Sequence, residues 1–118
     1  MSNAKKKSKK ILMEERKAIA KQLIQTSGLA SGDWVALDTI CNVRDYVLKH
    51  HDRFSEVFPK TFLLPTKEAL VGETYRRVIV NMLRRCAKVS GAAIIRKKTQ
   101  KWENGGNLTR YTYKLLSD

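Results

Sequence analysis

The sequence predicts a single α+β domain in which helices come first and a β-hairpin comes last. The chain has 118 residues, a length that fits one domain. Its apolar residues recur with a helical period up to about Ser90, and the period becomes that of strands after Gly91. Apolar residues make up 42% of the chain, which is enough for an ordinary core. We therefore expect three main helices followed by a C-terminal hairpin.

The N-terminal part predicts a basic arm, one helix and a short extended segment. Residues 1–10 contain five lysines without apolar periodicity, which is typical of a disordered arm. From Ile11 to about Ser27, apolar and charged residues separate onto two sides of a helix, and Gly28 is a suitable helix stop. Residues 34–37 favour an extended segment. The apolar stripe, with Ile11 lying off it, also allows a homodimer contact through residues 11–24.

A second helix is expected from Asp38, a good N-cap residue, to about His50. Residues 51–65 then form a long connection in which two prolines prevent a continuous helix. This connection also holds Phe54, Phe58 and Phe62, so it is too apolar for a free linker. We expect it to fold back onto the core, with room for one short helical turn.

The third helix is expected from Thr66 to about Ser90, with a candidate break at Gly72. At 100° per residue, one arc is apolar and the opposite arc is basic. The apolar arc comprises Val71, Tyr75, Val78, Ile79, Met82, Cys86 and Val89; the opposite arc comprises Glu73, Arg77, Asn81, Arg84 and Lys88, flanked by Arg76 and Arg85. Because Glu73 alone balances these cations, ion pairs within the helix do not explain the pattern.

Two strands are expected at residues 93–102 and 108–116, joined by a turn at 104–107 that is rich in Asn and Gly. In the second strand Tyr111 and Tyr113 alternate with Arg110 and Thr112, which predicts one core face and one wet, basic face. The basic residues along the two arms are Arg96, Lys97, Lys98, Lys101, Arg110 and Lys114, and Trp102 stands near the tip. A charged edge that resists aggregation is the alternative interpretation.

The charge balance points to a polyanionic partner. The net charge is +13, and residues 76–114 hold 11 basic side chains against the single acidic Glu103. Arginine can donate two hydrogen bonds to guanine, and asparagine can pair with adenine, so the third helix has the residue types that read DNA. No apolar run approaches the roughly 20 residues of a membrane span, so we expect no membrane partner.

The order helix, short strand, helix, basic helix and hairpin resembles the winged helix-turn-helix family of DNA-binding domains. Residues 72–91, GETYRRVIVNMLRRCAKVSG, look like a recognition helix and the glycine that leads into the wing; residues 93–97 and 110–115 look like the wing strands. The segment 51–65 departs from the tight turn of the family. The resemblance implies a winged helix-turn-helix domain over residues 11–118 that binds double-stranded DNA without catalysis, as a transcription or replication regulator.

By this resemblance, the third helix enters the major groove and the wing reaches the backbone or the minor groove. The candidate DNA-binding residues are Thr74, Arg76, Arg77, Asn81, Arg84, Arg85, Lys88, Arg96, Lys97, Lys98, Lys101, Trp102 and Arg110. Two other functions stay open. One is a winged-helix subunit whose third helix or phenylalanine segment docks onto a protein, and the other is RNA binding through Trp102, Tyr111 and Tyr113.

No catalytic, metal or cofactor site is expected. The sequence has no glycine-rich phosphate loop and no Cys-x-x-Cys or His-x-x-x-His spacing. His50 and His51 are adjacent and so point about 100° apart on a helix. Cys41 and Cys86 lie in apolar segments and read as reduced core thiols. The expected location is the cytoplasm or nucleoid in a prokaryote or phage, and the nucleus in a eukaryote.

Overall fold

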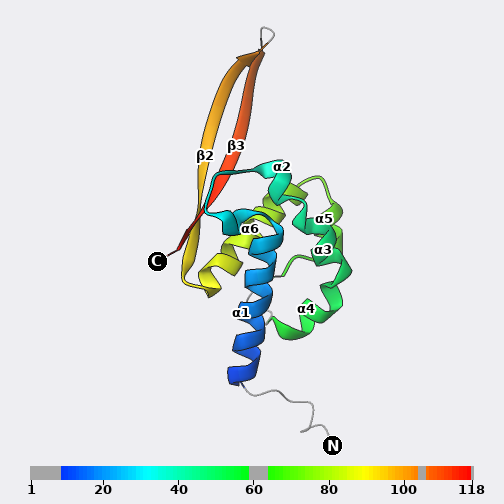
Figure 1. Ribbon diagram of the computed structural model, residues 1–118. Coiled ribbons are helices and arrows are strands. Elements are labelled where there is room, and N and C mark those ends of the chain that lie inside the picture. Colours follow the sequence, from blue (N-terminus) through cyan, green and yellow to red (C-terminus); the bar gives the residue numbers. More distant parts are fainter. Residues whose placement is uncertain (1–8, 59–63, 104–105, 118) are drawn as a thin grey trace, which may run out of the picture.

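The computed structural model describes residues 9–58, 64–103 and 106–117, in which helices precede a C-terminal β-hairpin (Figure 1). Helix α1 (Lys9–Thr26) is followed by the 3-10 helix η2 (Leu29–Ser31) and the short strand β1 (Val35–Ala36). Gly28, with φ of 88°, ends the first helix as expected. The basic arm lies outside the described residues up to residue 8, and Lys9 and Lys10 already belong to α1.

The expected second helix is in fact two short helices, α2 (Leu37–Ile40) and α3 (Val43–Lys49). The continuous helix from Asp38 was therefore wrong, and so was its cap, because Ala36 occupies the N-cap position and Asp38 lies in the first turn. The break falls at Cys41 and Asn42, where the backbone N–H of Asn42 donates to the carbonyl of Thr39, three residues back, instead of continuing the α-helical pattern.

The connection after His50 contains a helix of its own, α4 (His51–Val57), which is longer than the one short turn that the sequence suggested. Phe54, Val57 and Phe58 are buried, so this segment folds back onto the core as expected. The Nε atom of Arg16 in α1 donates a hydrogen bond to the carbonyl of Val57 at 2.7 Å. Phe62 lies outside the described residues.

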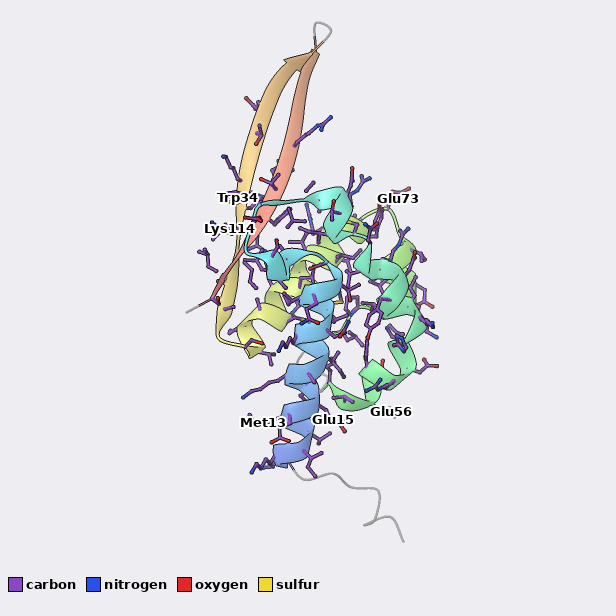
Figure 2. All side chains as sticks on the ribbon, in the orientation of Figure 1. Met13, Glu15, Trp34, Glu56, Glu73 and Lys114 are labelled. Carbon is purple, nitrogen blue, oxygen red and sulfur yellow. The ribbon has the colours of Figure 1, made fainter. Side chains whose placement is uncertain are left out.

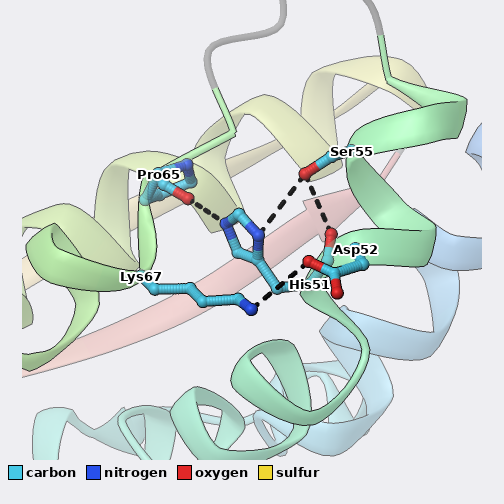
Figure 3. A network of polar contacts seen from close by, with 5 residues as sticks. All are labelled: His51, Asp52, Ser55, Pro65 and Lys67. Atoms are coloured by element: carbon cyan, nitrogen blue, oxygen red, sulfur yellow. Dashed lines mark hydrogen bonds and ion pairs between the residues drawn. The ribbon is translucent and has the colours of Figure 1, made fainter.

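Polar contacts tie α4 to the segment that enters the next helix (Figure 3). The Nε2 atom of His51 donates to the carbonyl oxygen of Pro65 at 2.6 Å, and the Oγ atom of Ser55 donates to the carbonyl of His51 at 2.9 Å. An exposed ion pair joins Lys67 to Asp52 at 3.3 Å. The histidine thus holds two backbone segments together and has a structural role.

The third helical region divides at Gly72 into α5 (Lys67–Val71) and α6 (Tyr75–Val89). Thr66 caps α5 by accepting a hydrogen bond from the backbone of Ala69. Because of the break, Val71 does not share the apolar arc of α6, and it is 62% exposed. Helix α6 packs against α1, and its buried residues are Ile79, Val80, Met82, Leu83, Cys86 and Ala87.

The C-terminal strands β2 (Ala92–Glu103) and β3 (Gly106–Ser117) form the expected hairpin, whose tip at residues 104–105 lies outside the described residues. The antiparallel sheet has the order β1-β3-β2. Ile94 and Tyr113 are buried and anchor the base of the hairpin to the helices. Beyond this base the two strands project past the helical body (Figure 1).

Candidate nucleic-acid interface

A groove of about 450 Å³ lies between the exposed side of α6 and the sheet. Its walls come from α2, α6, β2 and β3. The residues that line it are Leu37, Arg76, Arg77, Val80, Asn81, Arg84, Arg96, Tyr111 and Tyr113. Five of the thirteen predicted DNA-binding residues therefore meet at one groove, although they come from two separate elements.

The α6 wall follows from helical spacing. Arg77, Asn81 and Arg84 are four and three residues apart, so they share one face of the helix, and all three are exposed. The opposite face carries the buried Ile79 and Met82, which fix how the helix lies on α1. Burial of one face thus determines that the arginines and the asparagine point into the groove.

The sheet wall follows from strand alternation. Arg96 lies two residues after the buried Ile94, so both side chains are on the face of the sheet that meets α6, which we call the inner face. The guanidinium carbon of Arg96 lies 4.9 Å from the ring centre of Tyr111, so the tyrosine supports the arginine from below. Lys98 pairs with Tyr111 in the register and continues the inner face toward the tip.

The groove keeps an unbalanced positive charge. Among the described residues, four arginines and no acidic side chain line it. Arg76 forms an ion pair with Asp38 at 3.7 Å, but both side chains are largely exposed, and such pairs contribute little. Most of this positive charge is therefore not neutralised, and it lies on both a helix and a strand. Such a groove favours an anionic ligand that extends along both elements.

A second groove of about 490 Å³ follows the free edge of β3. It shares Leu37, Arg76 and Tyr111 with the first groove and adds Arg110 and Asp38. Strand β1 pairs only with Tyr113 and Thr112, so the edge of β3 is uncovered at Arg110. Arg110 therefore lines the second groove together with Arg76, which also belongs to the main groove.

The remaining predicted residues lie elsewhere. Thr74 is exposed at the N-cap position of α6, Lys88 is exposed in its last turn, and Arg85 is half-buried. Lys97 is on the outer face of the sheet, which faces away from α6, whereas Arg96 and Lys98 are on the inner face. Lys101 and Trp102 belong to β2, but their side chains lie outside the described residues.

Sequence reasoning missed Leu37 and Val80 as groove residues and placed Tyr111 in the core, whereas it is half-buried at the groove wall. The alternating pattern of β3 could have suggested the half-buried position of Tyr111, because the pattern continues beyond the part of the hairpin that the helices cover. The described phenylalanines of the 51–65 segment, Phe54 and Phe58, are buried and offer no docking surface.

Other kinds of site receive no support from the described residues. No group of three His, Cys, Asp or Glu side chains gathers there in a way that could hold a metal ion. Burial raises the pKa of the Cys41 thiol and raises the pKa of Cys86 to about 12, so neither is an activated nucleophile. In the ranges that the structure describes, no helix has the length and apolarity to cross a membrane.

Comparisons with protein-family models, with curated proteins and with solved structures found no match for this chain.

Proposed function

We propose that this protein is a winged helix-turn-helix domain that binds double-stranded DNA, without catalysis, as a regulator of transcription or replication. The observation that carries this proposal is the groove in which Arg77, Asn81 and Arg84 of α6 face Arg96 of β2 with no acidic residue between them. Duplex DNA offers what this surface lacks, which is a dense row of negative charges beside polar base edges.

The order of elements supports this class of fold. A helix, a short strand, further helices and a hairpin follow one another, and the first strand pairs with the last in a sheet of order β1-β3-β2. Helix α6 takes the place of the recognition helix, and β2 and β3 take the place of the wing. Helices α4 and α5 lengthen the connection before α6 without covering its exposed face, because Arg77 and Arg84 remain exposed.

Each part of the surface has a distinct task in this proposal. Arg77, Asn81 and Arg84 make base contacts in the major groove, since they stand together on one helical face. Arg96, Lys98 and Arg110 contact phosphates, because they lie on the hairpin, to one side of the helix that meets the bases. Arg96 and Lys98 do so from the inner face of β2, and Arg110 does so from the edge of β3. Duplex DNA is favoured over RNA bases stacked on the two tyrosines because Tyr113 is buried and Tyr111 is half-buried.

The test is a gel-shift titration of a blunt DNA duplex across a series of salt concentrations. We expect binding at low salt and a steep loss as salt rises, with log affinity changing by about 0.9 per neutralised phosphate for each tenfold change in salt. Arg84→Ala should weaken binding, whereas Lys49→Ala, which removes an exposed charge at the end of α3, should not. Equal effects of the two substitutions, or no binding at low salt, would refute the proposed surface.

A further inference from the structure

The outer face of the hairpin base presents an aromatic ring close to two cations. Trp34 is 41% exposed, although it is among the largest apolar side chains of the protein. The Nζ atoms of Lys97 and Lys114 lie 5.7 and 5.9 Å from the centre of its ring. Trp34 and Lys114 are labelled close together at the base of the hairpin in Figure 2.

Strand register explains why these three side chains meet. Val35 pairs with Tyr113, whose ring is buried on the inner face. Trp34 and Lys114 are each one residue away from that pair, so they point to the outer face. Lys97 pairs with Thr112 and shares this face. The ring and the two ammonium groups are thus fixed by the three elements of the sheet base.

This cluster of an exposed indole and two ammonium groups is complementary to a ligand that has both a flat ring and negative charge. Neither lysine forms an ion pair in the part of the chain that the structure describes. An exposed ring gains little from nearby cations in water, and two like charges beside one another repel. A nucleotide supplies a base that stacks on an indole and phosphates that neutralise ammonium groups.

We propose that the Trp34–Lys97–Lys114 cluster binds an unpaired nucleotide stretch, as a second nucleic-acid contact on the opposite face of the sheet from the α6 groove. The inference deepens the proposed function and rests on it for the class of ligand. Ile95 and Leu116 are also exposed beside the cluster. However, lysines are depleted at the centres of protein interfaces, so the two lysines beside Trp34 favour a polyanion over a protein partner.

The experiment compares two probes, oligothymidylate of about 20 nucleotides, which is longer than a typical single-strand site, and a blunt duplex. Trp34→Ala should weaken oligothymidylate binding by about fivefold to a hundredfold and leave duplex affinity unchanged. Trp34→Phe should retain most of the single-strand affinity because it keeps a stacking ring. Oligothymidylate should quench tryptophan emission in the wild type, and the quenching should be smaller in Trp34→Phe, which retains only Trp102.

The lysines provide an independent measurement. Replacing Lys97 and Lys114 by alanine should reduce the salt slope for oligothymidylate by about 0.7 per lost phosphate contact, and Lys49→Ala should leave that slope unchanged. Thermal melting shows whether each variant is folded, and Trp34→Phe and the lysine variants keep the core intact.

The outcomes separate the inference from the proposed function. Unchanged oligothymidylate affinity in Trp34→Ala and in the lysine double variant, with duplex binding intact, would overturn the inference alone. If the wild type did not bind the blunt duplex but bound oligothymidylate in a way that depended on Trp34, the proposed function alone would be overturned. Self-association that Leu116→Ser abolishes, together with unaltered oligothymidylate binding, would assign this face to a protein contact and overturn the inference.

Discussion

The helical body and the hairpin are stabilised in different ways. In the body, helices from distant parts of the chain share one core, in which Leu23, Phe54 and Leu83 are almost fully buried. In the hairpin, Ile94 and Tyr113 are buried in that core and Ala92, Tyr111 and Leu115 pack against it, whereas pairing between the two strands holds the length beyond these residues. Stability is therefore concentrated in the helical body, whereas the hairpin can carry charged side chains for binding with little effect on folding.

The largest change in stability is expected from a substitution in α4, the helix that the sequence did not predict. Phe54 is 1% exposed and packs near Tyr46, with ring centres 5.9 Å apart. Phe54→Ala should therefore lower the free energy of unfolding by about 3–5 kcal/mol, because it leaves a large cavity. Urea denaturation measures this change. A loss below about 1 kcal/mol would show that α4 is not part of the core.

A smaller effect is expected for substitutions on the exposed face of α6 that we propose contacts DNA, where affinity should change and stability should not. Arg77→Ala and Asn81→Ala should each cost about 1–3 kcal/mol in affinity for a preferred DNA site and relax base preference there. Their unfolding energies should stay within roughly 0.5 kcal/mol of the wild type, because both side chains are exposed. Binding to a randomised duplex library followed by sequencing measures the preference. A retained preference in both variants would remove base readout from α6.

The hairpin should show the opposite balance between affinity and sequence. Lys98→Ala on the inner face should weaken binding to all duplexes alike and reduce the salt slope by about one unit, if Lys98 contacts phosphate as we propose. Salt titrations of two unrelated duplexes measure this. If Lys98→Ala changed base preference instead, the hairpin would be the reader and α6 the support.

The order and type of most elements could be predicted from the sequence, and the meeting of side chains could not. The periodicity around Ile79 and Met82 located the buried face of α6, and thus the exposed Arg77 and Asn81. Helix α4 was missed because prolines dominated the interpretation of residues 51–65, although they lie beyond its end at Val57. Short helices have weak periodic signals, and their existence depends on tertiary contacts such as the one from Arg16.

The limits at the site have a similar cause. Alternation predicted that the hairpin has two faces, but only the register shows that Arg96 and Lys98 lie toward α6 and Lys97 lies away from it. The apolar stripe of the first helix illustrates the same point, because Ile19, Ala20, Leu23 and Ile24 are buried within the core. The homodimer contact through residues 11–24 stays a prediction, and it would be left to exposed side chains such as Ile11 and Met13. An apolar stripe indicates that a face is covered, and long-range contacts decide what covers it.

The smallest expected effect concerns the thiols and tests how tightly the body is closed. Burial raises the pKa of Cys86 from 9.0 to about 12, so the folded protein keeps this thiol protonated where the unfolded chain ionises it. The native state therefore binds more protons above pH 9.0, and stability should fall as the pH rises from there toward 12, by about 1 kcal/mol at pH 10. Urea denaturation at pH 8 and pH 10, compared between the wild type and Cys86→Ala, isolates this contribution from other titrating groups. If both proteins lost the same stability over that interval, water would reach Cys86 in the folded state, and the contact between α6 and α1 would be looser than the buried side chains indicate.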